Sequence, residues 1–142
     1  MKENKKKKKS KTIISAGVGK DFFDLERKHH KDKKKILKKG ELVKKSQITG
    51  LWTKKFFVLR VDKLMFFGNE KIWKGGVKSE GSIFLEGAAI EEYTSNPKLK
   101  EKRPYTFVIY SRGVTYFLEC NSESSMREWI EILVQCSSVR FS

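Results

Sequence analysis

Four lysines lie where two neighbouring strands of a predicted hairpin meet, and they are well suited to bind an anion. Lys44 and Lys45 end the first predicted strand, and Lys54 and Lys55 begin the second. A hairpin brings these ends together, so four ammonium groups converge near one loop, while strand alternation turns one lysine of each pair to either face. Clustered charge of this kind binds phosphate without burying an unpaired cation. The alternative is that all four are solvated lysines at strand ends.

Two connections between predicted strands place apolar side chains beside this positive charge. The first is the loop of residues 46–52, and the second follows the third predicted strand. Tryptophan favours the headgroup region of a bilayer and lysine extends its charge to the same depth, so both connections are candidates for membrane contact. Trp52 is equally suited to packing over the strand ends. Trp73 could instead cover a strand edge, but we expect it to be exposed. The candidate contact residues are Ile48, Leu51, Trp52, Lys71, Trp73 and Lys74.

From Ile36 onward apolar and polar residues alternate, which is the pattern of strands half-buried in a sheet. Turn signals such as Arg112-Gly113 separate segments rich in Val, Ile, Phe, Tyr and Leu. Short, closely spaced strands of this kind predict a mainly β fold, in which two orthogonal antiparallel sheets form a seven-stranded, partly open barrel. The predicted strands are 36–45, 55–60, 63–68, 82–85, 89–93, 105–110 and 114–120.

A helix over residues 122–137 follows the last predicted strand and is expected to cap the barrel. Ser122 is a suitable N-cap for this helix. One apolar stripe repeats along the helix at spacings of three and four residues, and the large aromatic Trp129 lies at its centre. The stripe consists of Met126, Trp129, Ile130 and Leu133.

The net charge of +15 is concentrated before the predicted barrel, in residues 1–39. We divide the chain into a disordered polybasic tail at 1–20, a short helix or linker at 21–35, and a folded domain at 36–139. Each basic residue near an anionic membrane contributes about 1 kcal/mol of attraction, which salt screens. The tail alone is equally compatible with nucleic-acid attraction, with a solvated tail or with a nuclear-import signal.

Catalysis, metal binding and membrane spanning have little support in the sequence. We find no nucleophile motif and no Gly-rich phosphate loop after a strand. His29 and His30 are adjacent and point apart on a helix, so they form no ligand set, and no apolar run approaches the ~20 residues that span a bilayer. Cys120 and Cys136 are interpreted as buried thiols in a reducing compartment rather than as a disulfide. We therefore expect a cytoplasmic protein that is not an enzyme and has no metal or cofactor.

Several short segments occur in an order that resembles one protein family. They are GELVKK at 40–45, WTKKFFVL at 52–59, KLMFF at 63–67, GSI at 81–83, and Trp129 in the final helix. The ordered set resembles the pleckstrin-homology (PH) domain family. The resemblance implies a seven-stranded, partly open barrel plugged by the C-terminal helix, with acidic phospholipid headgroups bound at the open end. It also implies a site built by the loop between strands 1 and 2, with help from the loop between strands 3 and 4.

The resemblance assigns roles to the lysines and also exposes departures from the family's phosphoinositide motif. It makes Lys44 and Lys55 the inward pair, and leaves the other two lysines, Lys45 and Lys54, as outer, membrane-facing charge. Thr53 occupies a basic position of the motif, Lys55 replaces an arginine, and Phe66 replaces a tyrosine. Lysine offers a point charge where arginine offers a bidentate fork, so recognition of several phosphates on one rigid ring is weakened.

Acidic phospholipid, as phosphatidic acid or a phosphoinositide, is therefore the expected ligand, bound on the cytosolic face of a membrane by a peripheral monomer. The alternative is a protein-interaction module of the same fold that binds a peptide along a barrel edge. Nucleic acid is not expected as a partner, because the barrel shows no basic-aromatic stacking platform.

Overall fold

The computed structural model describes residues 32–93 and 102–141. The predicted polybasic tail at 1–20, both histidines and most of the predicted helix at 21–35 lie outside these residues. Residues 32–35 form a turn, in which the Lys34 amide donates to the Asp32 carboxylate. The helix or linker expected at 21–35 stays a prediction. Within the described residues, no helix combines the length and the apolar character that a membrane crossing requires.

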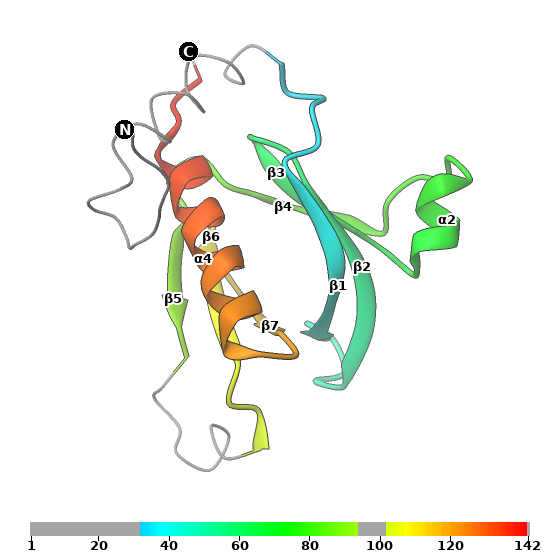
Figure 1. The fold of residues 1–142 in the computed structure, drawn as a ribbon, viewed down its shortest axis with the longest axis vertical. Coiled ribbons are helices and arrows are strands. Elements are labelled where there is room, and N and C mark those ends of the chain that lie inside the picture. The colour runs from blue at the N-terminus through cyan, green and yellow to red at the C-terminus, as the bar shows by residue number, and fades with distance from the viewer. Residues whose placement is uncertain (1–31, 94–101, 142) are drawn as a thin grey trace, which may run out of the picture.

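Seven antiparallel strands form the body of the molecule, in the spatial order β4-β3-β2-β1-β7-β6-β5 (Figure 1). The mainly β fold class with a C-terminal helix is confirmed, and most strand ends agree with the prediction within two residues. The strands are β1 (Lys38–Lys45), β2 (Trp52–Leu59), β3 (Lys63–Phe67), β4 (Gly81–Phe84), β5 (Ala89–Glu92), β6 (Thr106–Ser111) and β7 (Val114–Glu119).

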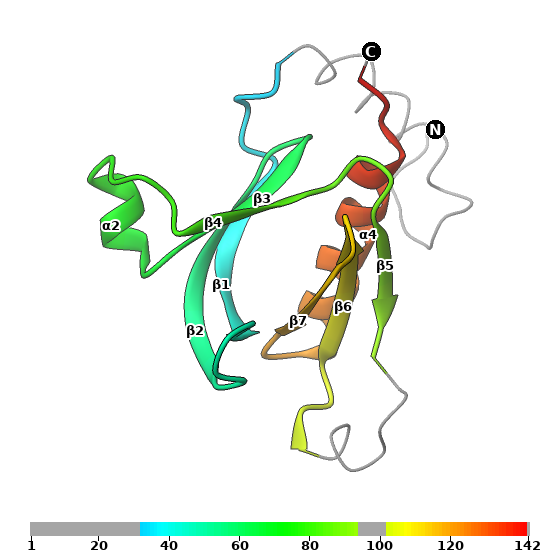
Figure 2. The same cartoon turned by 180° about the vertical axis from the view of Figure 1, so that it is seen from behind.

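The two predicted sheets are joined through β1 into one hydrogen-bonded sheet that bends sharply. β1 pairs with β2 along its whole length, whereas it pairs with β7 at only two positions, Val43 with Glu119 and Lys44 with Leu118. Strands β1–β4 and β5–β7 therefore form two layers that diverge from this short seam (Figures 1 and 2). Because β4 and β5 are the two edge strands of the sheet, the barrel is only partly closed.

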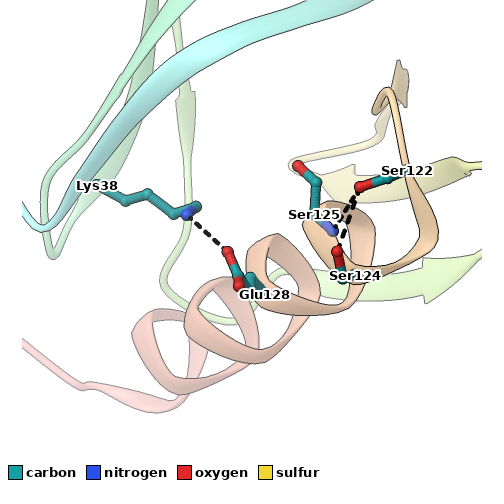
Figure 3. Close-up of polar contacts among 5 residues, drawn as sticks. All are labelled: Lys38, Ser122, Ser124, Ser125 and Glu128. Carbon is teal, nitrogen blue, oxygen red and sulfur yellow. Dashed lines mark hydrogen bonds and ion pairs between the residues drawn. The ribbon is translucent and has the colours of Figure 1, made fainter.

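Helix α4 (Glu123–Ser138) packs along β5 and β6 and seals the core. The side chains of Met126, Trp129 and Leu133 are buried, so the apolar stripe faces inward as predicted. The Ser122 hydroxyl accepts a hydrogen bond from the Ser125 amide and begins the helix (Figure 3).

A lysine at the start of β1 holds the two layers of the structure together across α4. The Lys38 ammonium lies 3.4 Å from the Glu128 carboxylate (Figure 3). It also lies 5.1 Å from the centre of the Trp129 ring. Contacts of this kind are individually modest, about 0.5–1 kcal/mol when partly exposed. They fix the position of the helix relative to β1, the strand that also carries the candidate site lysines.

Two element boundaries differ from the prediction in ways that affect the site. β2 begins at Trp52, three residues before the predicted start at Lys55, so Trp52 and Lys54 belong to a strand. The connection between β3 and β4 contains a short helix, α2 (Glu70–Lys74), where a loop was expected. The Asn69 side chain accepts a hydrogen bond from the Ile72 amide and caps this helix, a signal that the surrounding charged residues obscured.

Candidate functional site

A cavity of about 430 Å³ opens beside the β1–β2 loop. Its wall combines residues from the end of β1, the loop, the start of β2, and the neighbouring strands β3 and β4. Two ammonium groups and one carboxylate lie among apolar and hydroxyl side chains. The lining residues are Lys44, Ser46, Gln47, Ile48, Thr49, Leu51, Thr53, Lys55, Phe66 and Glu80.

Lys44 enters this cavity because strand alternation places it on the same face as the buried Leu42. Its side chain is only 8% exposed. The ammonium lies 4.9 Å from the centre of the Phe66 ring and 5.9 Å from that of Tyr116, and it donates to the Lys45 carbonyl at 3.4 Å. Burial lowers the pKa of Lys44 below its ordinary value, the nearby Lys55 charge lowers it further, and Glu80 opposes both. The positive charge of Lys44 is thus only partly offset by the groups around it.

Lys55 faces the same cavity, since it pairs with Leu42 in the β1–β2 register. Its ammonium lies 2.9 Å from a Glu80 carboxylate oxygen, and the two side chains are 25% and 46% exposed. The structure therefore brings the predicted inward pair, Lys44 and Lys55, to one cavity. Their role in binding an anion stays a prediction.

Lys45 and Lys54 point to the outer face of the sheet, opposite the cavity. The Lys45 ammonium lies 5.1 Å from the centre of the Phe117 ring. Lys54 is exposed, and its ammonium is 3.9 Å from the Glu41 carboxylate. The predicted division into inner and outer lysines agrees with the register of β1 and β2, and neither Lys45 nor Lys54 lines the cavity.

The β1–β2 loop is held in shape by its own hydrogen bonds. The Ser46 hydroxyl accepts from the Ile48 and Thr49 amides at 3.1 Å each, and the Ser46 amide donates to the Leu51 carbonyl at 2.7 Å. Gly50 adopts a φ of +76°, a left-handed conformation that favours glycine, and closes the turn. The loop backbone therefore needs little ordering when a ligand binds.

Apolar side chains project from this fixed loop into solvent. Ile48 is 95% exposed and Leu51 is 67% exposed. Gln47 anchors the loop to the other layer by donating from its side-chain amide to the Thr115 carbonyl at 3.1 Å. The arrangement places an apolar tip directly beside the cavity, as the sequence analysis expected for Ile48 and Leu51.

Trp52 is packed rather than free at the loop tip, but it packs on the outer face of β2 and not over the mouth of the barrel. It is half-buried on the outer face of β2, with its ring 6.5 Å from that of Phe117 in an edge-on arrangement. The Arg103 guanidinium stacks 4.1 Å above the tryptophan ring and pairs with Glu119 at 2.6 Å. These contacts use much of the ring surface that a bilayer would otherwise receive.

The expectation that Trp73 is exposed is wrong. Its ring lies 5.4 Å from that of Phe56 and covers a small apolar cluster on the outer face of β2 and β3, with the Lys39 ammonium 4.9 Å away on the ring. Helix α2 carries it, lying on the opposite side of the molecule from α4 (Figures 1 and 2). The apolar outer positions of β2 and β3 needed a cover, which the sequence pattern did not reveal.

The two lysines of α2 stay exposed but do not line the cavity. Lys71 is in solvent, and the Lys74 ammonium is 3.5 Å from the Glu70 carboxylate one turn earlier. Among the predicted membrane-contact residues, Ile48 and Leu51 line the cavity, whereas Lys71, Trp73 and Lys74 belong to the side of the sheet.

Sequence reasoning missed Glu80, which lines the cavity, and Tyr116, whose ring lies beside the Lys44 ammonium. The Glu80 amide donates to the Phe66 carbonyl at 2.9 Å, which places its carboxylate beside Lys55. Gly81 next to it leaves space for the Phe66 ring, because a Cβ at Gly81 would lie 2.6 Å from that ring. A glutamate just before a predicted strand gives no local signal of this role, since the contact depends on strand pairing.

The chemistry of the cavity fits an anion. Two ammonium groups provide charge-assisted hydrogen bonds, and the loop hydroxyls add neutral donors. In the described part of the chain, no group of three or more His, Cys, Asp and Glu side chains is arranged to hold a metal ion.

Cys120 and Cys136 are buried free thiols, as predicted, and burial raises their pKa values to about 11 and about 12.

Comparison with known proteins gives consistent results. Residues 36–138 match the model of the PH domain family. Human Rho GTPase-activating protein 25 is 28% identical over 103 residues, which cover 68% of this chain and 15% of that protein. The pleckstrin homology domain protein opy1 of Schizosaccharomyces pombe is 29% identical over 106 residues, covering 75% of this chain and 29% of that protein. The chain thus spans less than a third of either relative.

Solved structures share the architecture. The C-terminal PH domain of human pleckstrin superposes with a TM-score of 0.61 at 26% identity, over 75% of this chain and 93% of that one. The same pleckstrin domain in complex with D-myo-Ins(1,2,3,4,5)P5 gives a TM-score of 0.57 at 25% identity, over 72% of this chain and 99% of that one.

Proposed function

Because the chain belongs to the PH domain family, we propose that it is a membrane-recruitment module that binds acidic phospholipid headgroups in the cavity of Lys44 and Lys55. The ligand is phosphatidic acid or a phosphoinositide. The single observation that carries the proposal is the convergence of these two lysines on one cavity beside an exposed apolar loop. The inositol pentakisphosphate complexes of the pleckstrin domain support a phosphate ligand for the same fold.

The composition of the cavity favours a headgroup with one concentrated phosphate. Lys44 and Lys55 supply two cations, and Glu80 offsets one of them. Neither Thr53 nor Phe66, which also line the cavity, supplies the additional charge that a ring with several phosphates would use. A phosphomonoester such as phosphatidic acid needs charge at one point and matches two ammonium groups.

Membrane contact adds to headgroup binding. Ile48 and Leu51 insert into the interface next to the bound phosphate, where fully burying such a side chain contributes about 1.5–3 kcal/mol. Lys45 and Lys54, on the outer face, and the polybasic residues 1–20 add attraction to the anionic surface. Linked contacts to one surface act at high effective concentration, so no single one needs to be strong. The proposed site of action is the cytosolic face of a membrane.

Vesicle co-sedimentation tests the proposal. The double variant Lys44→Ala/Lys55→Ala is compared with wild type on phosphatidylcholine vesicles that contain phosphatidic acid or a phosphoinositide. The matched control is Lys34→Ala/Lys35→Ala, which removes the same charge from two exposed positions before β1. We expect the cavity variant to lose at least about tenfold in affinity, because each charge-assisted bond contributes about 1.5–3 kcal/mol.

The control variant and a chain lacking residues 1–19 should lose affinity in proportion to charge and retain the headgroup preference. Equal losses for the cavity and control variants would refute the site. Binding of a peptide without binding of any vesicle would instead support the protein-interaction alternative.

A further inference from the structure

Glu80 occupies the position on Lys55 that a phosphate oxygen would take. Its carboxylate oxygen lies 2.9 Å from the Lys55 ammonium, inside the same cavity. The Glu80 amide is fixed by its hydrogen bond to the Phe66 carbonyl at 2.9 Å. The carboxylate therefore lines the cavity in contact with Lys55, although the Glu80 side chain is 46% exposed.

The two cavity lysines are compensated differently. Lys44 rests on the Phe66 and Tyr116 rings and donates to one backbone carbonyl, so its charge is offset by neutral groups. Lys55 is offset by a full negative charge. An incoming phosphate can bind Lys44 directly, but it reaches Lys55 only by displacing the Glu80 carboxylate or by tolerating it at close range.

We propose that Glu80 is an internal competitor of the headgroup, and that it lowers the preference of the cavity for a doubly charged phosphate over a singly charged one. The inference rests on the proposed function of the cavity. A dianionic phosphomonoester gains enough from two ammonium groups to displace the carboxylate. A phosphodiester carries one negative charge and gains less, so Glu80 keeps Lys55.

The charges of the two ligand classes near neutral pH support this difference. A phosphomonoester has a second pKa of about 6 and carries nearly two negative charges at pH 7. The phosphodiester of phosphatidylserine carries one. Glu80 therefore weakens the binding of both lipids, and it weakens the binding of phosphatidic acid more, because the carboxylate repels the dianion more strongly and must be displaced by it.

The test is the substitution Glu80→Gln, which keeps the size and shape of the side chain and removes its charge. The matched control is Glu41→Gln, because Glu41 also pairs with a lysine, Lys54, but on the outer face of the sheet. Binding is measured on phosphatidylcholine vesicles that contain phosphatidic acid or phosphatidylserine at equal mole fraction. Titration with glycerol 3-phosphate, which lacks acyl chains, reports the cavity without the membrane.

We expect Glu80→Gln to raise affinity for phosphatidic acid vesicles by about five- to tenfold, the effect of removing one negative charge at contact distance. Affinity for phosphatidylserine vesicles should rise less, so the preference for phosphatidic acid grows. Glycerol 3-phosphate should also bind more tightly. Glu41→Gln should change each affinity by less than about twofold, because an exposed ion pair contributes little.

Equal effects of Glu80→Gln and Glu41→Gln would overturn the inference, because general charge would then account for the gain. Weaker binding by Glu80→Gln would also overturn it, since the carboxylate would then be a ligand contact. Failure of the proposed function has a different signature, in which Lys44→Ala/Lys55→Ala binds vesicles as the wild type does. Thermal unfolding of each variant checks that the fold is intact.

Discussion

Replacing Lys44 by methionine should make the domain more stable while it removes anion binding. Lys44 is buried, and burial is the main cause that lowers the pKa of its ammonium. The charged form is therefore disfavoured in the folded state at neutral pH. Methionine has a similar length and fits the space between the Phe66 and Tyr116 rings without a charge.

The net gain at pH 7 follows from opposing contributions. Loss of the contacts between the ammonium and the two rings costs about 0.5–1 kcal/mol. Burying an apolar terminus gains about 0.8 kcal/mol per methylene-sized group, and sulfur–aromatic contacts add about 0.3–1.5 kcal/mol. Relief of ammonium desolvation and of repulsion from Lys55 adds to this gain. We expect about 1 kcal/mol, or an increase in Tm of about 4–8 °C for a domain of this size.

The stability difference should depend on pH in a defined direction. The folded-state pKa of Lys44 lies below 10.5, so between these two values the unfolded chain binds more protons. Stability of the wild type therefore rises with pH through this window, and the part of the Lys44→Met advantage that comes from relief of the buried charge disappears above 10.5. Urea denaturation from pH 7 to the alkaline limit, with Lys54→Met as the exposed control, measures the difference. A variant no more stable than wild type at pH 7 would refute the reasoning.

Further predictions concern the loop, the helix and the thiols. Ile48→Asp should lower vesicle affinity by about tenfold or more. It should change the free energy of unfolding by less than about 0.5 kcal/mol, because Ile48 is exposed. Unchanged co-sedimentation would exclude insertion of the loop. Ser122→Ala should destabilise the domain by about 1 kcal/mol through loss of the α4 cap, measured by urea denaturation; no loss would show that the cap is dispensable. Cys120 and Cys136, with pKa values raised to about 11 and about 12, should react with a thiol reagent at pH 8 only on unfolding; rapid labelling of the folded protein would contradict their burial.

Local periodicity was sufficient to predict most of the fold. Alternation marked the strands, and the i, i+3, i+4 spacing with a capping serine marked α4 because these signals depend only on neighbouring residues. The early start of β2 was missed because Thr53 and Lys54 are polar, yet β1 pairs with them along the hairpin. Helix α2 was missed because five residues give too short a periodic pattern.

The candidate site was predicted in part for the same physical reason. Lys44 and Lys55 were found because a hairpin necessarily brings its strand ends together. Glu80 reaches the cavity through the packing of its segment against β3, and the Tyr116 ring approaches Lys44 from β7, across the seam with β1; sequence spacing encodes neither contact. Trp73 was misplaced because its burial depends on an apolar outer face of β2 and β3 that only the assembled sheet reveals.

The opposite orientations of Lys44 and Lys45 make this site unusually sensitive to changes in chain length. Inserting one residue between Lys38 and Val43 would turn Lys44 to the outer face and put Val43 in its place, if the start of β1 and all of β2 kept their positions and the loop absorbed the change. The net charge would be almost unchanged, yet the cavity would lose its buried ammonium. A designer who changes the lipid preference of this scaffold can therefore vary its composition but must keep the length of β1 constant.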